Sequence, residues 1–186
     1  MSTFTVTELP LPGLKRLTRR RFEDQRGRFS RLFCPTALQQ AGWQGPVAQI
    51  NHSVTQHEGT VRGLHYQRPP HEEMKLVSCL QGRIWDLVVD MRPDSFTFLH
   101  WHAETLDADE DNALLIPTGF AHGFQTLTPN VELIYCHSAG YEPAFEAGLR
   151  VDDPALAILW PLAVKNLSAR DQAFPLIEPG FEGVSR

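Results

Sequence analysis

Two short segments contain histidines whose surroundings favour proton transfer or anion binding. The first is the run 62–67, RGLHYQ, which contains Arg62 and His65, and the second is the run 117–124, PTGFAHGF, which contains His122. A strand that follows a Pro-x-Gly turn can aim an imidazole at the interior of a small β-barrel, and imidazole titrates near pH 6.5. Either histidine alone is also compatible with a hydrogen-bonded core residue. Together with Arg62 and Lys75 they favour a polar site, because apolar cores do not hold unpaired charges.

The elements that must position these residues are short strands. Proline and glycine recur (14 and 13), and short apolar runs broken by turn residues are typical of strands. The expected strands are Met74–Leu80, Arg83–Asp90, Phe96–Trp101, Ala113–Ile116, Gly123–Leu127 and Val131–His137. The first two, separated by Gln81-Gly82, are predicted to form a hairpin. One short helix is expected at Thr36–Ala41, between Pro35 and Gly42.

This pattern predicts an all-β barrel or sandwich, in a single domain over residues 1–186, because no linker interrupts the chain. In the run 83–90, Ile84, Asp86 and Val88 should face one side of the sheet, and Leu87 and Val89 the other. The proline-containing tail, residues 152–186, is expected to wrap over the β body as irregular or partly helical chain.

Composition excludes several classes of protein. With 42% hydrophobic and 21% charged residues the chain is ordinary for a globular protein, and no apolar run is long enough to span a membrane. Residues 1–10 lack the basic and apolar regions of a signal peptide, so we expect a cytoplasmic location. The three cysteines, Cys34, Cys79 and Cys136, have no metal or disulfide spacing and are expected to be reduced and mostly buried.

The net charge of −5 hides a basic segment. Residues 15–31 carry eight basic and two acidic side chains, whereas the rest of the chain is strongly acidic. The acidic remainder argues against a nucleic-acid partner. A small anion held by a few arginines and a solvated basic edge strand are both compatible with this segment.

Eight motifs give the chain a resemblance to a known family. They are DQRGRF (24–29), QINHS (49–53), TVRGLHYQ (60–67), KLV (75–77), DLVVDMR (86–92), IPTGFAHGF (116–124), IYCHSAGYEPAFE (134–146) and SARD (168–171). In this order they resemble the dTDP-4-dehydrorhamnose 3,5-epimerase family. The resemblance covers residues 22–175 and implies a cupin double-stranded β-helix, that is, a jelly-roll barrel, with an N-terminal strand extension and a short C-terminal wrap.

The resemblance implies an isomerase that uses no metal and no organic cofactor. Its substrate would be a nucleotide-diphosphate 4-keto-6-deoxyhexose, inverted at C3, at C5 or at both, in deoxysugar or surface-polysaccharide synthesis. Removing a proton beside a ketone creates an enolate, so a base must lie within about 3 Å of the C–H bond and a cation or donor at the ketone oxygen. By the family pattern His65 is the base and Asp171 its partner, Lys75 faces the enolate oxygen, and Tyr135 returns a proton from the opposite face.

The resemblance also implies residues that bind the diphosphate, the base or the sugar. They are Arg26, Phe29, Arg31, Gln49, Asn51, Arg62, His122, Glu146 and Arg170. Because Arg62 and His65 are separated by an odd number of residues, a bulge near Gly63 is needed for both to line one pocket. Relatives pair as homodimers that exchange N-terminal strands, and we expect the same here.

Two positions depart from the family pattern. The run 26–31, RGRFSR, ends in Arg31 where the family has a glutamate that accepts the imide N–H of thymine. An arginine can only donate, so a cytidine-linked substrate is an alternative. Cys136 stands where a lysine commonly follows the tyrosine.

Two other classes of cupin protein are alternatives to a cofactor-independent epimerase. A metal-dependent enzyme would need an irregular site from His65, Glu72 and His122, because the usual HxH pair is absent there. The pair His100 and His102 has that spacing but lies too close to His122 in sequence, so strand alternation explains it better. A module that only binds sugar nucleotides should lack one of the four catalytic residues, and all four are present.

Overall fold

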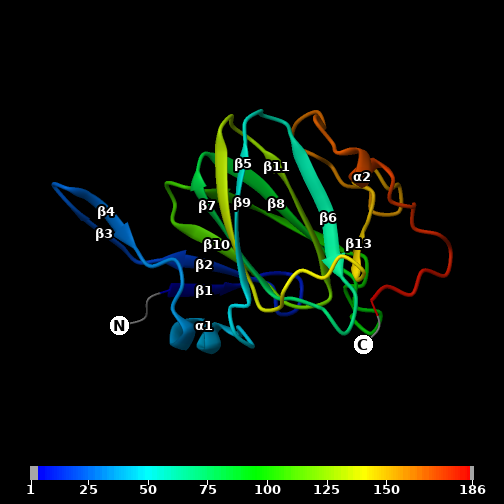
Figure 1. Cartoon of the computed structure of the whole chain (residues 1–186), viewed down its shortest axis with the longest axis horizontal. Coiled ribbons are helices and arrows are strands. Elements are labelled where there is room, and N and C mark those ends of the chain that lie inside the picture. Colours follow the sequence, from blue (N-terminus) through cyan, green and yellow to red (C-terminus); the bar gives the residue numbers. More distant parts are fainter. Residues whose placement is uncertain (1–3, 185–186) are drawn as a thin grey trace.

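Two antiparallel sheets face each other in the computed structural model, which describes residues 4–184 (Figure 1). The larger sheet has the order β1 (Phe4–Glu8), β2 (Lys15–Arg19), β10 (Asn112–Ile116), β7 (Lys75–Gln81), β12 (Val131–His137), β5 (Gln49–Thr55). The smaller has the order β13 (Glu146–Gly148), β6 (Val61–Gln67), β11 (Phe120–Thr126), β8 (Arg83–Asp90), β9 (Trp101–Asp107). The ends of the expected domain, residues 1–3 and 185–186, lie outside the described part.

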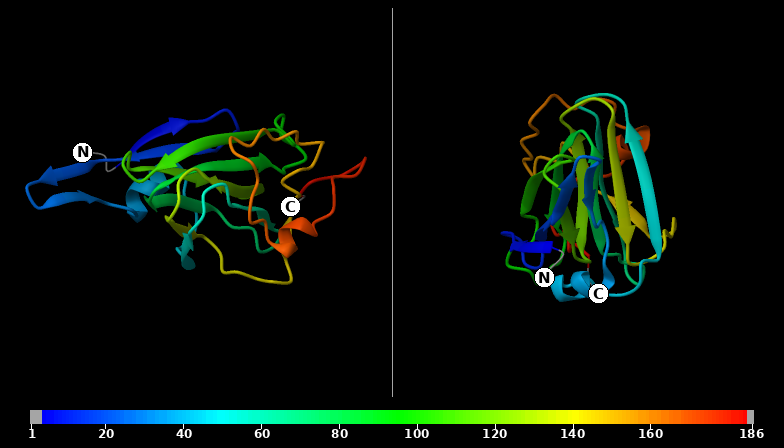
Figure 2. Two further views of the ribbon diagram at one scale, coloured as in Figure 1. Left: turned by 90° about the horizontal axis from the view of Figure 1, so that it is seen from above. Right: turned by 90° about the vertical axis from the view of Figure 1, so that its left-hand side faces the viewer.

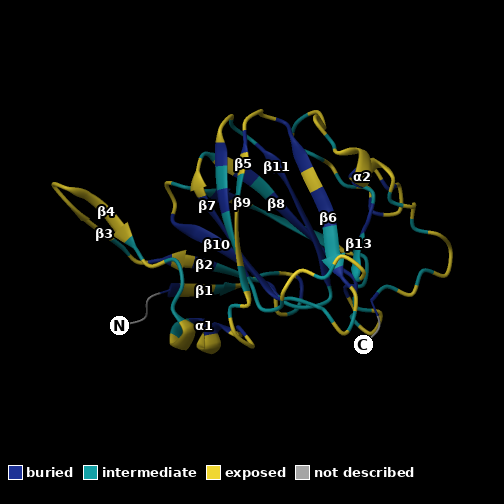
Figure 3. Cartoon of the chain, in the orientation of Figure 1, coloured by how far each residue is buried: buried dark blue, intermediate teal, exposed yellow. Residues whose placement is uncertain are grey.

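Strand alternation places the core as the sequence predicts. Ile84 and Val88 of β8 lie in the cluster between the sheets, together with buried residues of β7, β10, β11 and β12. Leu87 and Val89 lie in a second cluster on the outer face of the smaller sheet, which residues from the C-terminal tail cover. Figure 3 shows the resulting contrast between the buried strands β10 and β11 and the exposed ends of the molecule.

The predicted hairpin between the runs 74–80 and 83–90 is wrong. The strands β7 and β8 exist, but β7 lies between β10 and β12 whereas β8 lies between β11 and β9, in the opposite sheet. Gly82, with a φ of +74°, turns the chain from one sheet to the other. A tight glycine turn serves a sheet crossing as well as a hairpin, so the local sequence does not distinguish them.

The predicted strand Phe96–Trp101 is also wrong, because the strand begins at Trp101 and the residues before it form turns. The cause is the fully buried carboxylate of Asp90, which accepts hydrogen bonds from Ser95 Oγ at 2.6 Å and Thr97 Oγ1 at 2.7 Å. Arg92 binds the same carboxylate, with its Nη2 2.7 Å from Oδ2. These contacts fold residues 92–97 around Asp90 instead of letting them extend.

Other expectations are confirmed with small shifts of boundary. The helix α1 (Pro35–Ala41) starts with its proline and ends at Gly42, which has a φ of +108°. The tail is irregular except for the one-turn helix α2 (Ala169–Gln172). All three cysteines are free thiols, and two of them are buried. Neither helix in the range 4–184 has the length and apolarity to cross a membrane.

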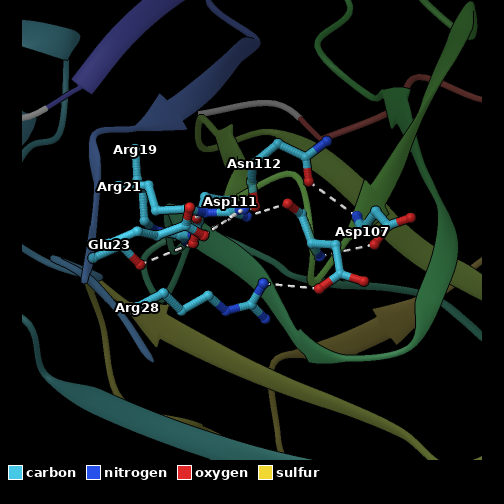
Figure 4. Close-up of polar contacts among 9 residues, drawn as sticks. Arg19, Arg21, Glu23, Arg28, Asp107, Asp111 and Asn112 are labelled. Carbon is cyan, nitrogen blue, oxygen red and sulfur yellow. Dashed lines mark hydrogen bonds and ion pairs between the residues drawn. The ribbon is translucent and has the colours of Figure 1, made fainter. Parts of the chain in front are cut away.

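A two-stranded hairpin, β3 (Arg21–Asp24) and β4 (Gly27–Ser30), extends beyond the barrel (Figures 1 and 2). Its base is fixed by the acidic turn between β9 and β10 (Figure 4). Asp111 accepts hydrogen bonds from Arg21 Nε and, at 2.8 Å, from Ser30 Oγ, and Arg28 lies 2.8 Å from Asp109. Burial alone would raise the pKa of Asp111, but the bonds from Arg21 and Ser30 lower it. Much of the basic segment is therefore neutralised within the chain.

Candidate active site

A cavity of about 430 Å³ lies between the two sheets. Strands β5, β7 and β12 contribute one wall, and β6, β11 and β13 the other, with a residue of α2 at the edge. It brings together ten of the thirteen site residues that the sequence predicts, nine of them in its lining and Asp171 directly behind His65. The nine are Gln49, Asn51, Arg62, His65, Lys75, His122, Tyr135, Glu146 and Arg170.

His65 and Asp171 form a close pair. The imidazole Nε2 lies 2.8 Å from Oδ1 of Asp171, whose side chain is almost completely buried. The N-cap Ser168 fixes the start of α2 by accepting a hydrogen bond from Asp171 N at 3.0 Å. Burial tends to raise the pKa of Asp171, but its bond to His65 and the charge there lower it. Because Nε2 is engaged by a carboxylate, Nδ1 is the nitrogen left to accept a proton.

The expected bulge in β6 is confirmed. His65 pairs with His122 and Arg62 with Phe124, so β6 has one residue more than β11 across this interval. Gly63 has a φ of +137°, and a Cβ there would lie 2.6 Å from the Cα of Gly123. Only glycine fits this backbone and this close approach, and the bulge turns both Arg62 and His65 toward the cavity.

Lys75 is held by two contacts in the cavity wall. Its Nζ lies 3.1 Å from Oε1 of Glu73 and donates to the carbonyl oxygen of His65 at 3.3 Å. Both charged side chains are more than nine-tenths buried. The other oxygen of Glu73 accepts from Gln67 Nε2 at 2.8 Å. An ammonium has three N–H groups, so one remains for a ligand.

Tyr135 lies between two imidazoles, with the ring centroids of His122 and His137 each 6.2 Å from its own. Its Oη contacts Ser53 Oγ at 3.5 Å. Burial raises the pKa of Tyr135 above its usual range, an effect that the bond to Ser53 and the charge of Arg62 oppose. Ser53 and Arg62 are therefore the polar groups that favour ionisation of the phenol. Burial, with the charges of Lys75 and His122, lowers the pKa of His137 to about 4.

His122 forms a second histidine–carboxylate pair. Its Nε2 lies 2.7 Å from Oδ1 of Asp86, which is completely buried. The other oxygen, Oδ2, has no hydrogen-bond partner among the residues that the structure describes. One ring nitrogen of His122 is thus committed to Asp86, and at most the other can contact a phosphate oxygen.

The mouth of the cavity carries a chain of polar contacts. Glu146 Oε2 accepts hydrogen bonds from Tyr141 Oη at 2.7 Å and from Arg170 Nη1 at 2.8 Å. On the opposite side Gln49 donates to Asn51 Oδ1 at 3.0 Å and accepts from Tyr141 N at 3.0 Å. These groups can recognise a sugar, a base or a diphosphate.

Three predicted binding residues, Arg26, Phe29 and Arg31, are not part of this cavity. They lie on or directly after the β3–β4 hairpin, which extends away from the barrel (Figure 1). Arg26 pairs with Asp24, and the ring of Phe29 is 63% exposed. The hairpin carries them away from the cavity of their own chain, and their part in binding stays a prediction.

Several residues of the site were missed by the sequence analysis: Ser53, Glu73, His137 and Tyr141 line the cavity, and Asp86 pairs with His122. Alternation offered a signal for three of them. Ser53 and His137 lie two residues from Asn51 and Tyr135 on their strands, and Asp86 shares the core-facing register of Ile84 and Val88. Within residues 4–184 no three His, Cys, Asp or Glu side chains are grouped so as to hold a metal ion, so the irregular set His65, Glu72 and His122 does not form one.

The chain is similar to known proteins over most of its length. The family model described as dTDP-4-dehydrorhamnose 3,5-epimerase matches residues 8–178. The dTDP-4-dehydrorhamnose 3,5-epimerase of Sinorhizobium fredii is 36% identical over 168 residues, 90% of this chain and 86% of that protein. The dTDP-4-dehydro-6-deoxyglucose 3-epimerase of Streptomyces bikiniensis is 38% identical over 156 residues, 83% of this chain and 79% of that protein.

A solved crystal structure from the same family has the same fold as this chain. The dTDP-4-dehydrorhamnose 3,5-epimerase of Bacillus anthracis, solved with TDP and PPi bound, superposes with a TM-score of 0.90 at 38% identity and covers 94% of this chain and 99% of its own. The two facing sheets are thus the cupin jelly roll. The chain belongs to the dTDP-4-dehydrorhamnose 3,5-epimerase family.

Proposed function

We propose that the protein epimerises a nucleotide-linked 4-keto-6-deoxyhexose at C3, at C5 or at both by proton transfer through enolates. The observation that carries the proposal is the convergence of the His65–Asp171 pair, Lys75 and Tyr135 on one cavity. A base, an electrophile and a separate acid are the three groups that inversion beside a ketone requires.

In the first step His65 Nδ1 takes the proton from the carbon next to the ketone. Asp171, which accepts the Nε2–H, holds the ring and stabilises the imidazolium. The remaining N–H of Lys75 binds the oxygen on which negative charge develops. Because this ammonium is anchored by Glu73 and by a backbone carbonyl, little reorganisation is needed when the charge appears.

In the second step Tyr135 gives a proton to the opposite face of the enolate. Its raised pKa supports this role, because the phenol keeps its proton until a strongly basic carbon is present. Ser53 and Arg62 are placed to stabilise the phenolate that remains. Water then restores the proton on Tyr135 and removes the one on His65.

The nucleotide part of the substrate would bind at the mouth. Arg62 and Arg170 supply charge for the diphosphate, and Gln49, Asn51 and Glu146 supply polar contacts. The names of the relatives support a thymidine nucleotide. Arg31, whose side chain is exposed, favours a cytidine-linked substrate as the second candidate. The relatives include 3,5-epimerases and a 3-epimerase. The experiment must therefore also determine whether C3, C5 or both carbons are inverted.

A homodimer would complete the site. The hairpin carries Arg26 and Phe29 away from their own cavity, and its aromatic rings Phe22 and Phe29 are more than half exposed. A second copy is the simplest partner for both features. Light scattering at micromolar concentration tests this, and a monomer would contradict it. The single domain and the cytoplasmic location of a deoxysugar pathway stay predictions.

Solvent deuterium incorporation at C3 and C5 tests the function. The protein is incubated in D2O with thymidine- and cytidine-diphosphate 4-keto-6-deoxyglucose, and exchange is followed by proton NMR. Exchange at one or both carbons, absent from a His65→Asn control, is the expected result. No exchange with either substrate would contradict the proposal.

A further inference from the structure

Arg170 touches the catalytic pair as well as the mouth of the cavity. Its Nη2 lies 3.2 Å from His65 Nε2, and its Nε lies 3.6 Å from Asp171 Oδ1. Its Nη1 donates to Glu146 Oε2 at 2.8 Å. One guanidinium is thus shared among His65, its partner carboxylate Asp171 and the carboxylate of Glu146 at the rim of the cavity. Its side chain is 52% exposed, so a ligand can reach it.

The backbone fixes this arrangement from two sides. Helix α2 places Arg170 directly before Asp171, so the two side chains leave adjacent positions of one turn. Strand β13 pairs with β6, with Gly148 opposite His65 and Glu146 opposite Gln67. Glu146 therefore stands beside the strand of the base. Tyr141 donates to the same Glu146 oxygen and holds the carboxylate in place.

Two effects of this position oppose proton abstraction. A cation 3.2 Å from the ring disfavours the positive charge that His65 gains when it takes a proton. The same cation also shares the negative charge of Asp171, which otherwise serves the imidazolium alone. Both effects disappear when another anion draws the guanidinium away from His65 and Asp171.

We propose that Arg170 couples occupancy of the diphosphate site to the activity of His65. In the empty site Glu146 holds Arg170 against the His65–Asp171 pair and slows proton abstraction. A bound diphosphate draws the guanidinium away, because it offers a bidentate dianionic partner whereas Glu146 offers one oxygen already shared with Tyr141. Arg170 is in this sense a positioning residue. The inference rests on the proposed function and explains how binding of a remote group reaches the reacting carbon.

The test divides the substrate into two pieces. A free 4-keto-6-deoxyhexose is incubated with the full-length protein in D2O, with and without saturating thymidine diphosphate, and exchange beside the ketone is measured by NMR. If thymidine diphosphate binds weakly, cytidine diphosphate replaces it. We expect the nucleoside diphosphate to accelerate exchange at least about tenfold, since binding energy of a remote group can be used at the reacting centre.

Two variants test whether the acceleration by the nucleoside diphosphate depends on Arg170. Arg170→Gln keeps a hydrogen-bonding side chain without the charge, and exchange of the free sugar should rise while acceleration by the nucleotide disappears. Arg62→Gln is the matched control, because Arg62 lines the same cavity but its hydrogen bonds go to Thr55 and Val54. It should weaken nucleotide binding and keep the acceleration at saturation.

The outcomes separate the coupling from the function. Equal acceleration in wild type and Arg170→Gln at saturating nucleotide would overturn the coupling, and so would a fall in basal exchange in Arg170→Gln with its far-ultraviolet circular dichroism unchanged. Failure of the proposed function looks different, because then the intact nucleotide-linked ketosugar shows no exchange with the wild-type protein.

Discussion

Asp86 Oδ1 lies 2.7 Å from His122 Nε2, and this buried pair lies beside Tyr135 through the contact between the His122 and Tyr135 rings. The second oxygen of Asp86 has no hydrogen-bond partner within the described residues, so His122 is the main group that compensates this carboxylate. Removing one partner of a buried pair costs more than removing both, because a lone buried charge remains.

His122→Phe should therefore lower the free energy of unfolding by about 3 kcal/mol, the lower end of the range for breaking a buried pair. The double variant His122→Phe/Asp86→Leu should recover part of that loss. Urea denaturation at one fixed protein concentration measures both. A double variant less stable than the single one would show that Asp86 has other compensating contacts.

His65→Asn should lower kcat by about two to four orders of magnitude, the range for a positioned general base. The fold should persist, because the ring is partly exposed at the cavity and an amide can still bind Asp171. Exchange of the substrate C–H for deuterium measures the base directly. Near-normal exchange in the variant would remove His65 from this role.

Tyr135→Phe should separate abstraction from inversion. Proton removal by His65 does not need the phenol, so exchange should continue, whereas net inversion should fall because the acid on the other face is gone. NMR of exchange and of product configuration in the same sample gives the ratio. Equal loss of both would indicate that Tyr135 acts only in packing against His122 and His137.

Arg31→Glu should improve binding of thymidine diphosphate relative to cytidine diphosphate. A thymine N–H that faces an arginine is left unpaired, at a cost of about 1 to 3 kcal/mol, and a carboxylate can accept it. Calorimetry of both proteins with both diphosphates measures the preference. Because Arg31 lies outside the cavity of its own chain, an effect also requires the partner's hairpin to reach the mouth. An unchanged preference would mean that another residue selects the base.

The stability of the hairpin base should depend on pH through Asp111. The bonds from Arg21 and Ser30 lower its pKa in the folded protein, so its contribution is present above the unfolded value of about 3.9 and is lost as the pH falls through the folded value. Wild type should exceed Asp111→Asn in Tm at pH 6, and the difference should shrink toward pH 3. Thermal unfolding across this range measures it, and a constant difference would exclude the linkage.

The sequence predicts that His65, Lys75 and Tyr135 line one cavity because each lies on a strand with a fixed alternation, and the one irregular step, at Gly63, has a glycine to permit it. Asp171 lies on helix α2 instead, where strand alternation gives no signal. Which strands pair with one another is harder to predict from the sequence. The glycine turn before β8 is local, but the choice between hairpin and sheet crossing depends on which distant strands compete for β7.

The direction of the β3–β4 hairpin could not be predicted from the sequence either, because it also depends on contacts between distant parts of the chain. Arg21 and Asp111 are 90 residues apart in sequence, and only the folded barrel brings them together. Contacts such as Glu73 with Lys75 were within reach, since the two residues are close in sequence and a buried ammonium requires a carboxylate.

The acidic turn that holds the hairpin has a consequence for protein engineering. Residues 21–30 and 107–111 form one unit split between two distant stretches of the gene, joined by the bonds to Asp109 and Asp111. A chimera can receive the β3–β4 hairpin of a relative without the acidic turn of that relative. The hairpin would then lack the contacts that fix its orientation relative to the barrel. Transfer of the hairpin between family members is therefore a two-segment graft, and libraries that vary the hairpin should vary the turn with it.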